Sequence, residues 1–435
     1  VYKILKNLVI RNLTVSKYST SDLRIISIVI ALIPVSLITG PAIPDILLSL
    51  VGLYFIVISL NKKLFSFYLN YFFLISITFY FCLLLSSLFS DYPLLSMTKE
   101  GSIFYFRYIF FVLAIWYLLE CKEKFIQVLL ITITLSLFIL TVDSLFEYFN
   151  GHNIFNFERR SGWRVTSLFK DENILGRYVS FFSAFGFILA HYKKNFSRKD
   201  FIFSYLILFS GLIVAYLSGE RTAFFQLSLF ILIVFLILDL KNKLRFFLSL
   251  ITTLIILLSI LYINPNANNQ MINQTYKQIS NTEFKYLPFS NHHLSHLETA
   301  YKMFIDKPVI GVGTNLFRFK CEEKKYHLES SSGKKINACS THPHNYYFQI
   351  LSENGLFGIF FLVFFYFFVI FIFFKNLIIL FYKKSSKKII QNKIMICILL
   401  LVLWFPFIPH MSFFNNWYNV LLMFPLGFFL KDLDN

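Results

Sequence analysis

The chain has 435 residues, of which 57% are hydrophobic and only 15% are charged, and its 41 Lys and Arg outnumber its 23 Asp and Glu to give a net charge of +18. So apolar a composition is typical of a polytopic membrane protein and excludes an ordinary soluble domain. The excess positive charge does not indicate nucleic acid as a partner, because most of the cations lie between apolar runs, where they set membrane topology. We therefore predict an all-α, polytopic integral membrane protein that forms a single membrane domain over residues 1–435.

Apolar runs of about 17 to 25 residues predict about twelve transmembrane helices, of which the first, second and eleventh are short enough to be re-entrant or tilted. In chain order, the predicted spans are residues 23–40, 43–60, 67–89, 101–119, 125–147, 172–192, 201–218, 222–239, 244–263, 350–374, 394–409 and 413–430.

Lysines and arginines recur in every second connection, which predicts that both termini face the cytoplasm. The basic start of the chain is not followed by an apolar run before residue 25, so it resembles an amphipathic segment on the inner leaflet more than a cleavable signal. The basic sets on this side include Lys62 and Lys63, Lys122 and Lys124, Lys193 and Lys194, Lys241 and Lys243, and Lys383 and Lys384.

Two outer segments are long enough to build a site: a periplasmic loop at 148–171 and a large periplasmic loop at 264–343, between spans nine and ten. Apolar residues at helical spacing predict a helix over 292–306 that lies against the membrane surface. Cys321 and Cys339 share the larger loop and could form a disulfide in an oxidising compartment, although two cysteines alone do not decide this.

The most unusual feature is the polar sequence T-H-P-H-N, which ends at Asn345 and opens the long apolar tenth span. We expect Thr341 or His342 to cap this helix, so that His344 lies at the positive end of the helix dipole, where a neutral imidazole is favoured. A neutral imidazole is a competent general base. Gly355 and Gly358 follow on the same apolar helix, and we expect them to let another helix approach closely and so fix its rotation.

The second feature is a set of arginines on the outer side, where the topology rule does not require them. Arg221 lies in S-G-E-R-T on a short turn, and Arg177 lies inside the sixth predicted span, where it either pairs with a neighbouring carboxylate or binds an anion. Arg164 is a third candidate, and Arg159 and Arg160 have weaker claims. The planar guanidinium group suits phosphate oxygens.

A base and several guanidinium groups at one membrane surface fit the displacement of a lipid-linked diphosphate by a sugar hydroxyl. The base takes the acceptor proton, and the arginines offset the charge of the departing diphosphate. The connection between the first two predicted spans, around G-P-A-I-P-D, contains only Asp45, and the sole D-x-D, Asp432 to Asp434, lies on the cytoplasmic side. A metal-dependent mechanism is therefore disfavoured, and we predict no metal and no cofactor. The sequence H-H-L-S-H at 292–296 lacks a nearby acidic or cysteine ligand set, and G-V-G-T-N at 311–315 is interpreted as a turn.

The pattern of His344, Asn345, Gly355 and Gly358 resembles the signature of the O-antigen ligases and of the related O-antigen polymerases and protein-targeting O-oligosaccharyltransferases. The twelve predicted spans and the large outer loop are similar to that superfamily as well. The resemblance implies a bacterial inner-membrane glycosyltransferase that acts at the periplasmic face, without metal and with inversion at the anomeric carbon. The donor of this enzyme would be a glycan linked to undecaprenyl diphosphate, and membrane lipids would surround the enzyme.

By this resemblance His344 is the catalytic base, and Arg221 matches the family's arginine at the outer start of the eighth span, with Arg164 or Arg177 as the second diphosphate ligand. A ligase transfers the glycan to lipid A core, and a polymerase transfers it to another lipid-linked glycan. The intact signature places the ligase first. A protein-targeting enzyme ranks third, because only K-D-L-D-N follows the last span. A lipid-linked glycan transporter is the non-enzymatic alternative, but it would need charges at mid-membrane, where the exceptions are few: Arg107, Asp143, Glu147 and Arg177.

Overall fold

The computed structural model describes residues 20–121, 124–158, 163–192, 198–237, 240–280, 291–329, 335–336, 338–382 and 387–434. These residues are predominantly helical, as the composition predicts. The helices before the large outer segment are α2 (Thr20–Ser36), α3 (Ala42–Asn61), α4 (Tyr71–Leu88), α5 (Phe106–Cys121), α6 (Lys124–Asn150), α7 (Leu175–Tyr192), α8 (Arg198–Leu217), α9 (Arg221–Ile237) and α10 (Leu240–Ile263).

The segment at 264–343 is named the large outer segment after its predicted side of the membrane, and its described residues form helices and a hairpin rather than a simple loop. It contains α11 (Asn266–Asn268), α12 (Gln274–Ser280), α13 (Asn291–Asp306), α14 (Phe317–Lys320) and a hairpin of β1 (Leu328–Glu329) antiparallel to β2 (Lys335–Ile336). The chain ends with α15 (Tyr346–Tyr382), α16 (Lys387–Leu403) and α17 (Asn416–Asp434).

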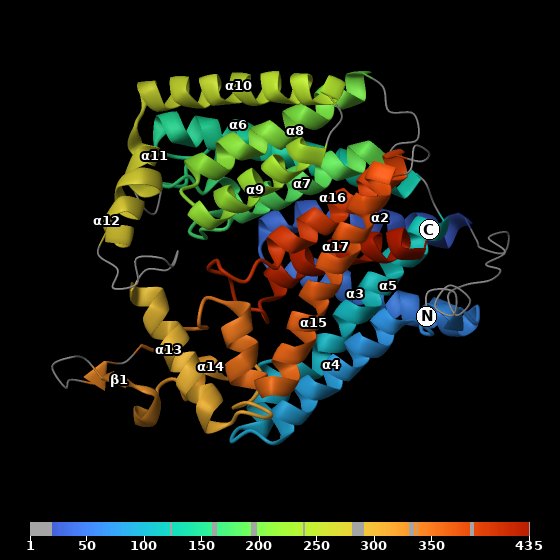
Figure 1. The fold of residues 1–435 in the computed structure, drawn as a ribbon, viewed down its shortest axis with the longest axis vertical. Helices are drawn as coiled ribbons and strands as arrows, with labels where there is room; N and C mark the ends of the chain where they lie inside the picture. Colours follow the sequence, from blue (N-terminus) through green and yellow to red (C-terminus); the bar gives the residue numbers. More distant parts are fainter. Residues whose placement is uncertain are drawn as a thin grey trace.

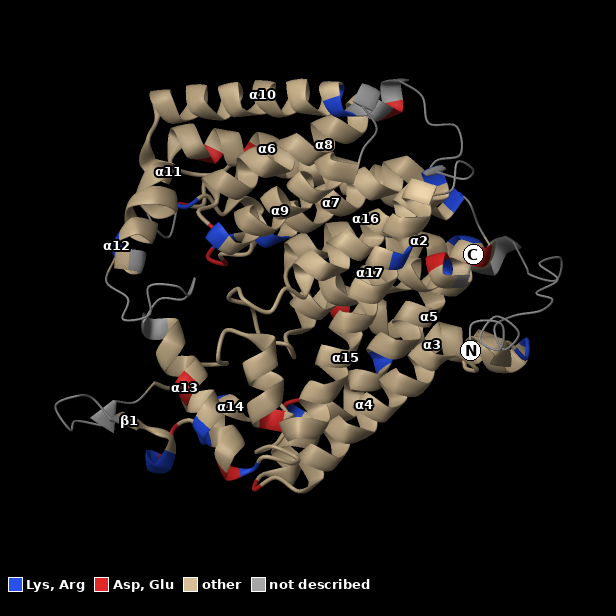
Figure 2. Ribbon diagram, viewed as in Figure 1, with Lys and Arg blue, Asp and Glu red and all other residues tan. Residues whose placement is uncertain are grey.

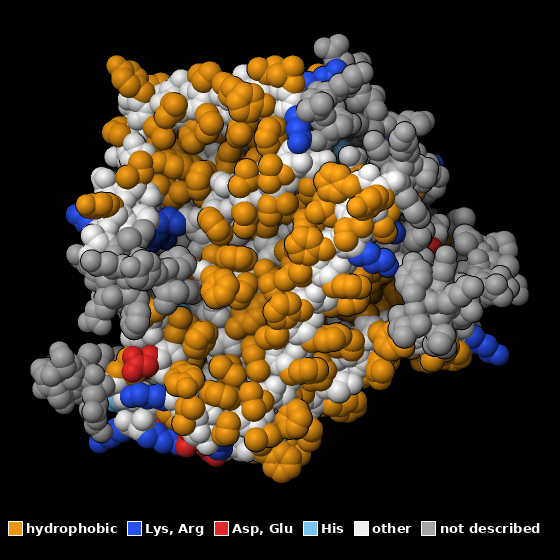
Figure 3. Space-filling model, viewed as in Figure 1, with side chains coloured by type: hydrophobic (Ala, Val, Ile, Leu, Met, Phe, Trp, Pro, Cys, Tyr) orange, Lys and Arg blue, Asp and Glu red, His pale blue; other side chains and the backbone are white. Residues whose placement is uncertain are grey.

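Six described helices are long and apolar enough to cross a membrane. They are Ala42–Asn61, Tyr71–Leu88, Leu95–Cys121, Lys124–Asn150, Lys243–Ile263 and Tyr346–Tyr382, and shorter apolar helices cover Leu23–Thr39, Ile202–Leu217 and Arg221–Ile237. A helix lies over every one of the predicted spans, but the number that crosses the membrane stays a prediction. Apolar side chains cover the middle of the surface in Figure 3, and charged side chains gather toward its margins.

The helices form one bundle with a smaller outer assembly at one end (Figure 1). Neighbouring pairs in the bundle include α7 with α8, α3 with α5, and α17 with α5. In Figure 1, α13, α14 and β1 lie together at the lower left, whereas the carboxyl terminus lies at the right. The outer assembly has a small core of its own, formed by Ala300, Met303, Val312, Phe317, Cys321 and Tyr326.

The helix predicted over 292–306 is present as α13, and it packs on α15. Its buried face includes Leu297, Ala300 and Met303, which contact protein. The apolar spacing in the sequence therefore marks a face that joins the outer assembly to the bundle.

Most of the ribbon inside the bundle in Figure 2 is uncharged. The charged residues found there make structural contacts at two places. Arg107 pairs with Asp45 at 2.8 Å, which ties the starts of α5 and α3. Asp143 and Glu147 point from α6 to the backbone of residues 153–167, where Glu147 accepts the amide hydrogens of Thr166 and Ser167. These contacts hold the outer loop that carries Arg164.

Candidate functional site

The start of α15 differs from the sequence prediction in one respect. The helix begins at Tyr346 and is capped by Asn345, whose Oδ1 accepts the amides of Tyr347 at 3.0 Å and Phe348 at 3.3 Å. The expectation that Thr341 or His342 caps the helix was wrong. Asn345 also donates through Nδ2 to the carbonyl oxygen of Pro406 at 2.7 Å, so it joins this junction to the segment between α16 and α17.

His344 precedes the helix and has a left-handed backbone, with φ +57. Such a conformation is strained for histidine and is held here by the surrounding contacts. Its carbonyl oxygen accepts the amide of His410 at 2.7 Å, and its Nε2 lies 3.4 Å from the Ser340 hydroxyl. The side chain is therefore turned out of the helix axis and toward the outer assembly.

The two glycines act differently from the prediction. Gly355 has φ +63 and breaks α15, and an added Cβ would lie 2.4 Å from the carbonyl oxygen of Val309. It accommodates the backbone of residues 308–313 rather than another helix, so the predicted helix-to-helix role was wrong. An added Cβ at Gly358 would meet side chains of its own helix, Asn354 and Ile350.

Residues 308–313 replace the hydrogen bonds that α15 loses at this break. The amides of Val312 and Gly313 donate to the carbonyl oxygens of Ser352 and Glu353, both at 3.0 Å. In return the amide of Leu356 donates to Pro308 at 2.8 Å. Gly311 and Gly313 have positive φ, so G-V-G-T-N is a turn, as interpreted from the sequence. The Glu353 carboxylate fixes this turn by accepting the amides of Asn315 and Phe317.

A cluster of imidazole rings surrounds His344. Ring centroids lie 4.2 Å away for His342, 5.1 Å for His293 and 5.5 Å for His296. His293 and His296 come from α13, so the packing of α13 on α15 brings them here. Burial and then the neighbouring His342, His293, His296 and Arg177 lower the pKa of His344 to about 2. The direction of this pKa shift favours the neutral imidazole expected from the sequence, but burial rather than the helix dipole is its largest cause.

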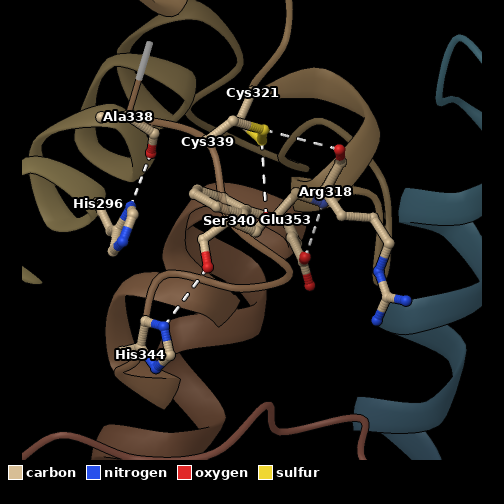
Figure 4. The surroundings of a disulfide bond; sticks show 9 residues. His296, Arg318, Cys321, Ala338, Cys339, Ser340, His344 and Glu353 are labelled. Carbon is tan, nitrogen blue, oxygen red and sulfur yellow. Dashed lines mark hydrogen bonds between the residues drawn. A yellow bond between two sulfur atoms is a disulfide. The ribbon is translucent and has the colours of Figure 1, made fainter. Parts of the chain in front are cut away.

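A short strap, residues 338–344, carries His344 (Figure 4). Cys339 in the strap is joined to Cys321 by a disulfide with a Cα–Cα distance of 5.0 Å. His296 lies at the other side of the strap and donates through Nδ1 to the Ala338 carbonyl oxygen at 2.7 Å. The strap is therefore held at three successive residues: Ala338 accepts from His296, Cys339 forms the disulfide, and Ser340 contacts His344.

The arginines form a second group beside the histidines. Arg177 on α7 lies 3.7 Å from Glu220, measured from Nε to Oε2, so the neighbouring carboxylate considered for it exists. Arg177 Nη1 is buried and donates no hydrogen bond. The positive charge of Arg177 also lowers the pKa of His344, His342 and His410, so Arg177 acts on the histidines as well as on Glu220.

Arg164 and Arg221 complete the second group. Arg164 packs over Gly219, and its charge acts on both Glu220 and Arg221. Arg221 starts α9 and donates through Nη1 to the Thr275 hydroxyl of α12 at 3.1 Å. Arg159 and Arg160 lie outside the described residues. The structure thus brings the loop at 148–171, α7, α9 and the start of α15 close together.

Residues 205–363 match the O-antigen ligase family model. The match confirms the resemblance drawn from the signature, and it includes Arg221, His344, Asn345, Gly355 and Gly358. It fits a multi-pass inner-membrane protein and an enzyme of the ligase or polymerase kind. The O-antigen ligase family implies lipid-linked glycan and lipid A core substrates in general. No curated protein sequence matches the chain.

Arg164 and Arg177 lie outside the matched residues, so their place beside Arg221 comes from the fold alone. Sequence reasoning missed Glu220 as a member of this group, and it missed His410, whose ring stacks on Tyr346 at 3.7 Å. The sequence H-H-L-S-H, which contains His293 and His296, was interpreted only as an incomplete metal motif. Within the described parts of the chain, no three His, Cys, Asp or Glu side chains are placed to hold a metal ion. The helical spacing of His293 and His296 on one face of a predicted helix was the available signal.

Proposed function

We propose that the protein is a ligase-type glycosyltransferase that moves a glycan from undecaprenyl diphosphate to an acceptor hydroxyl, with lipid A core as the acceptor, at the periplasmic face. The observation that carries this proposal is the position of Arg177. This arginine has a buried nitrogen that makes no hydrogen bond, it lies 3.7 Å from Glu220, and its charge acts on His344. A buried donor without an acceptor is unfavourable unless a ligand uses it.

In this proposal the acceptor hydroxyl transfers its proton to His344 while its oxygen forms a bond to the anomeric carbon. The bond between that carbon and the diphosphate oxygen breaks, and the diphosphate leaves with the electron pair. Arg177, Arg221 and Arg164 stabilise the charge that develops on the leaving group. Attack from the face opposite the leaving group inverts the anomeric carbon.

The donor also increases the basicity of His344. In the protein alone, burial and the nearby cation Arg177 oppose protonation of the imidazole. A bound diphosphate brings negative charge close to the imidazole and favours the imidazolium form. His344 therefore gains its capacity as a base only when the leaving group is in place.

Asn345, Gly355 and Gly358 are proposed as supports of this arrangement. Asn345 fixes the start of α15, and Gly355 lets residues 308–313 close over the helix. We also propose that both termini face the cytoplasm, which places the junction at His344 on the periplasmic side.

The transporter alternative is not favoured by the contacts of the charged residues. Arg107 pairs with Asp45, and Asp143 and Glu147 accept hydrogen bonds from the loop at 153–167. These groups serve packing, so they do not form a path of cations across the bilayer.

A deletion strain tests the proposal through its glycolipid profile. A ligase predicts free lipid A core together with lipid-linked polymer that persists. A single repeat on the core would instead assign the protein as a polymerase. Purified protein that moves the lipid-linked glycan between leaflets and forms no glycosidic bond would overturn the enzymatic proposal.

A further inference from the structure

The Glu220 side chain lies against the amino terminus of α7. It lies in the turn between α8 and α9, after Gly219 with φ +69, and its Oε1 accepts the amide of Gly176 at 2.6 Å. Gly176 is required for this approach, because an added Cβ would lie 2.8 Å from the Cβ of Glu220. The positive end of the helix dipole of α7 favours a negative charge at this position.

The other carboxylate oxygen is buried and accepts no hydrogen bond. The Glu220 side chain is only 9% exposed, and Oε2 lies 3.7 Å from Arg177 Nε. Arg177 Nη1 is also buried without a hydrogen bond. Two opposite buried charges thus meet with incomplete hydrogen bonding, which is unfavourable for a purely structural ion pair.

The charged groups that face Glu220 are all cations. Arg177 from α7 and Arg164 from the loop at 148–171 act on Glu220 directly. Arg221, the next residue in the chain and the start of α9, is acted on by the charge of Arg164. A diphosphate brought to these arginines would meet the negative charge of Glu220. The anion and the carboxylate therefore compete for the same cations.

We infer that, in the absence of the donor, the Glu220 carboxylate occupies the position among these arginines that the donor's diphosphate takes on binding; this inference rests on the proposed function. When the diphosphate binds, the carboxylate takes up one proton. The proton comes from solvent and converts the carboxylate to a neutral carboxyl group. This releases Arg177 to the phosphate oxygens and provides an O–H donor toward them. When the free diphosphate product leaves, the proton returns to solvent and the pair of Glu220 with Arg177 forms again.

The direction of the pH dependence follows from this exchange. Burial raises the pKa of Glu220 to about 7, against the attraction of Arg177 and Arg164. A bound diphosphate raises this pKa further, because it adds negative charge nearby. Above pH 7 binding must therefore take up a proton, and the affinity falls by up to about tenfold for each unit of pH.

The test measures binding of a sugar-linked polyprenyl diphosphate, whose phosphates stay ionised, to the full-length protein in lipid nanodiscs between pH 7 and pH 9. We expect the Kd of the unsubstituted protein to rise about tenfold or more over this range. Glu220→Gln should bind more tightly at pH 9 and show a flat profile. Glu172→Gln is the matched control, because Glu172 is an exposed carboxylate of the outer loop, and it should follow the unsubstituted protein.

A second measurement does not depend on the folding of the variant. Calorimetry of the unsubstituted protein at pH 8, in buffers with different ionisation enthalpies, should show uptake of about one proton per diphosphate bound. No uptake, or a Glu220→Gln profile as steep as that of the unsubstituted protein, would overturn the inference while leaving the proposed function intact. Failure of the unsubstituted protein to bind the diphosphate at any pH would overturn both.

Discussion

A pair of buried carboxylates on α6 and the single buried carboxylate Glu220 make different contacts in this protein. On α6, all four carboxylate oxygens of Asp143 and Glu147 accept hydrogen bonds from residues 154–167. At the other site, Glu220 has one oxygen bonded and one without a hydrogen bond, and it faces arginines. Burial alone therefore does not distinguish these two sites, but the carboxylates on α6 are fully hydrogen-bonded and Glu220 is not.

The largest expected effect on transfer comes from the histidine beside the incomplete site. His344→Ala should lower the transfer rate by about 10²- to 10⁴-fold, because it removes the proposed general base. The measurement is glycan transfer by purified protein, with membrane insertion checked separately. His327→Ala is the control, since His327 lies in the outer assembly away from the ring cluster. Full activity of His344→Ala would remove the general-base role.

Arg177→Lys tests the incomplete hydrogen bonding directly. Lysine keeps the charge but lacks the planar fork, so we expect transfer to fall about 10²-fold. Arg107→Lys is the matched control, because Arg107 also has a buried nitrogen without a hydrogen bond but forms a close ion pair with Asp45 at 2.8 Å, against 3.7 Å for Arg177 with Glu220. Equal losses in both variants would break the distinction between the two kinds of buried charge.

The disulfide should have a smaller effect on transfer. Replacing both Cys321 and Cys339 with Ser frees the strap that carries His344, and we expect transfer to fall about three- to tenfold through poorer positioning of the base. Alkylation of free thiols before and after reduction reports on the bond itself. Cys82→Ser, which changes a free cysteine, should leave transfer unchanged, and an unchanged rate in the double variant would show that the strap is held without the disulfide.

Glu147→Gln should change stability and leave chemistry alone. An amide group cannot accept from both Thr166 and Ser167, so one buried amide loses its acceptor at a cost of about 1–3 kcal/mol. Thermal unfolding in detergent should show a lower Tm, whereas transfer per folded molecule should not change. Glu172→Gln should keep the Tm. A specific loss of transfer at full stability would place Glu147 with the functional charges.

The helices were predictable because apolar length and periodicity are local properties of the chain. α13 was found from the spacing of residues such as Leu297 and Ala300, and the membrane helices were found from their apolar runs. His344 and Arg221 could be selected as candidates because polar groups at the ends of such runs are unusual. These inferences need no knowledge of which elements pack together.

The remainder depends on long-range packing. Gly355 was expected to face another helix, because its sequence neighbours look helical, and only the approach of residues 308–313 explains its positive φ. The helix is capped by Asn345 because the backbone of His344 leaves the helical conformation, and the carbonyl oxygen of His344 accepts the amide of His410. Similarly, the sequence shows Glu220 beside Arg221, but its contact with Arg177 arises from the packing of α7 against the α8 to α9 turn.

The break in α15 bears on how the protein is made. A helix interrupted at membrane depth leaves amide and carbonyl groups that lipid cannot satisfy. Their partners, residues 308–313, precede α15 in the chain, so they are synthesised first. They can pair with α15 as it enters the bilayer. In the proposed topology, residues 308–313 must therefore cross the membrane before α15 is inserted, because without them the break would leave these groups unpaired in lipid.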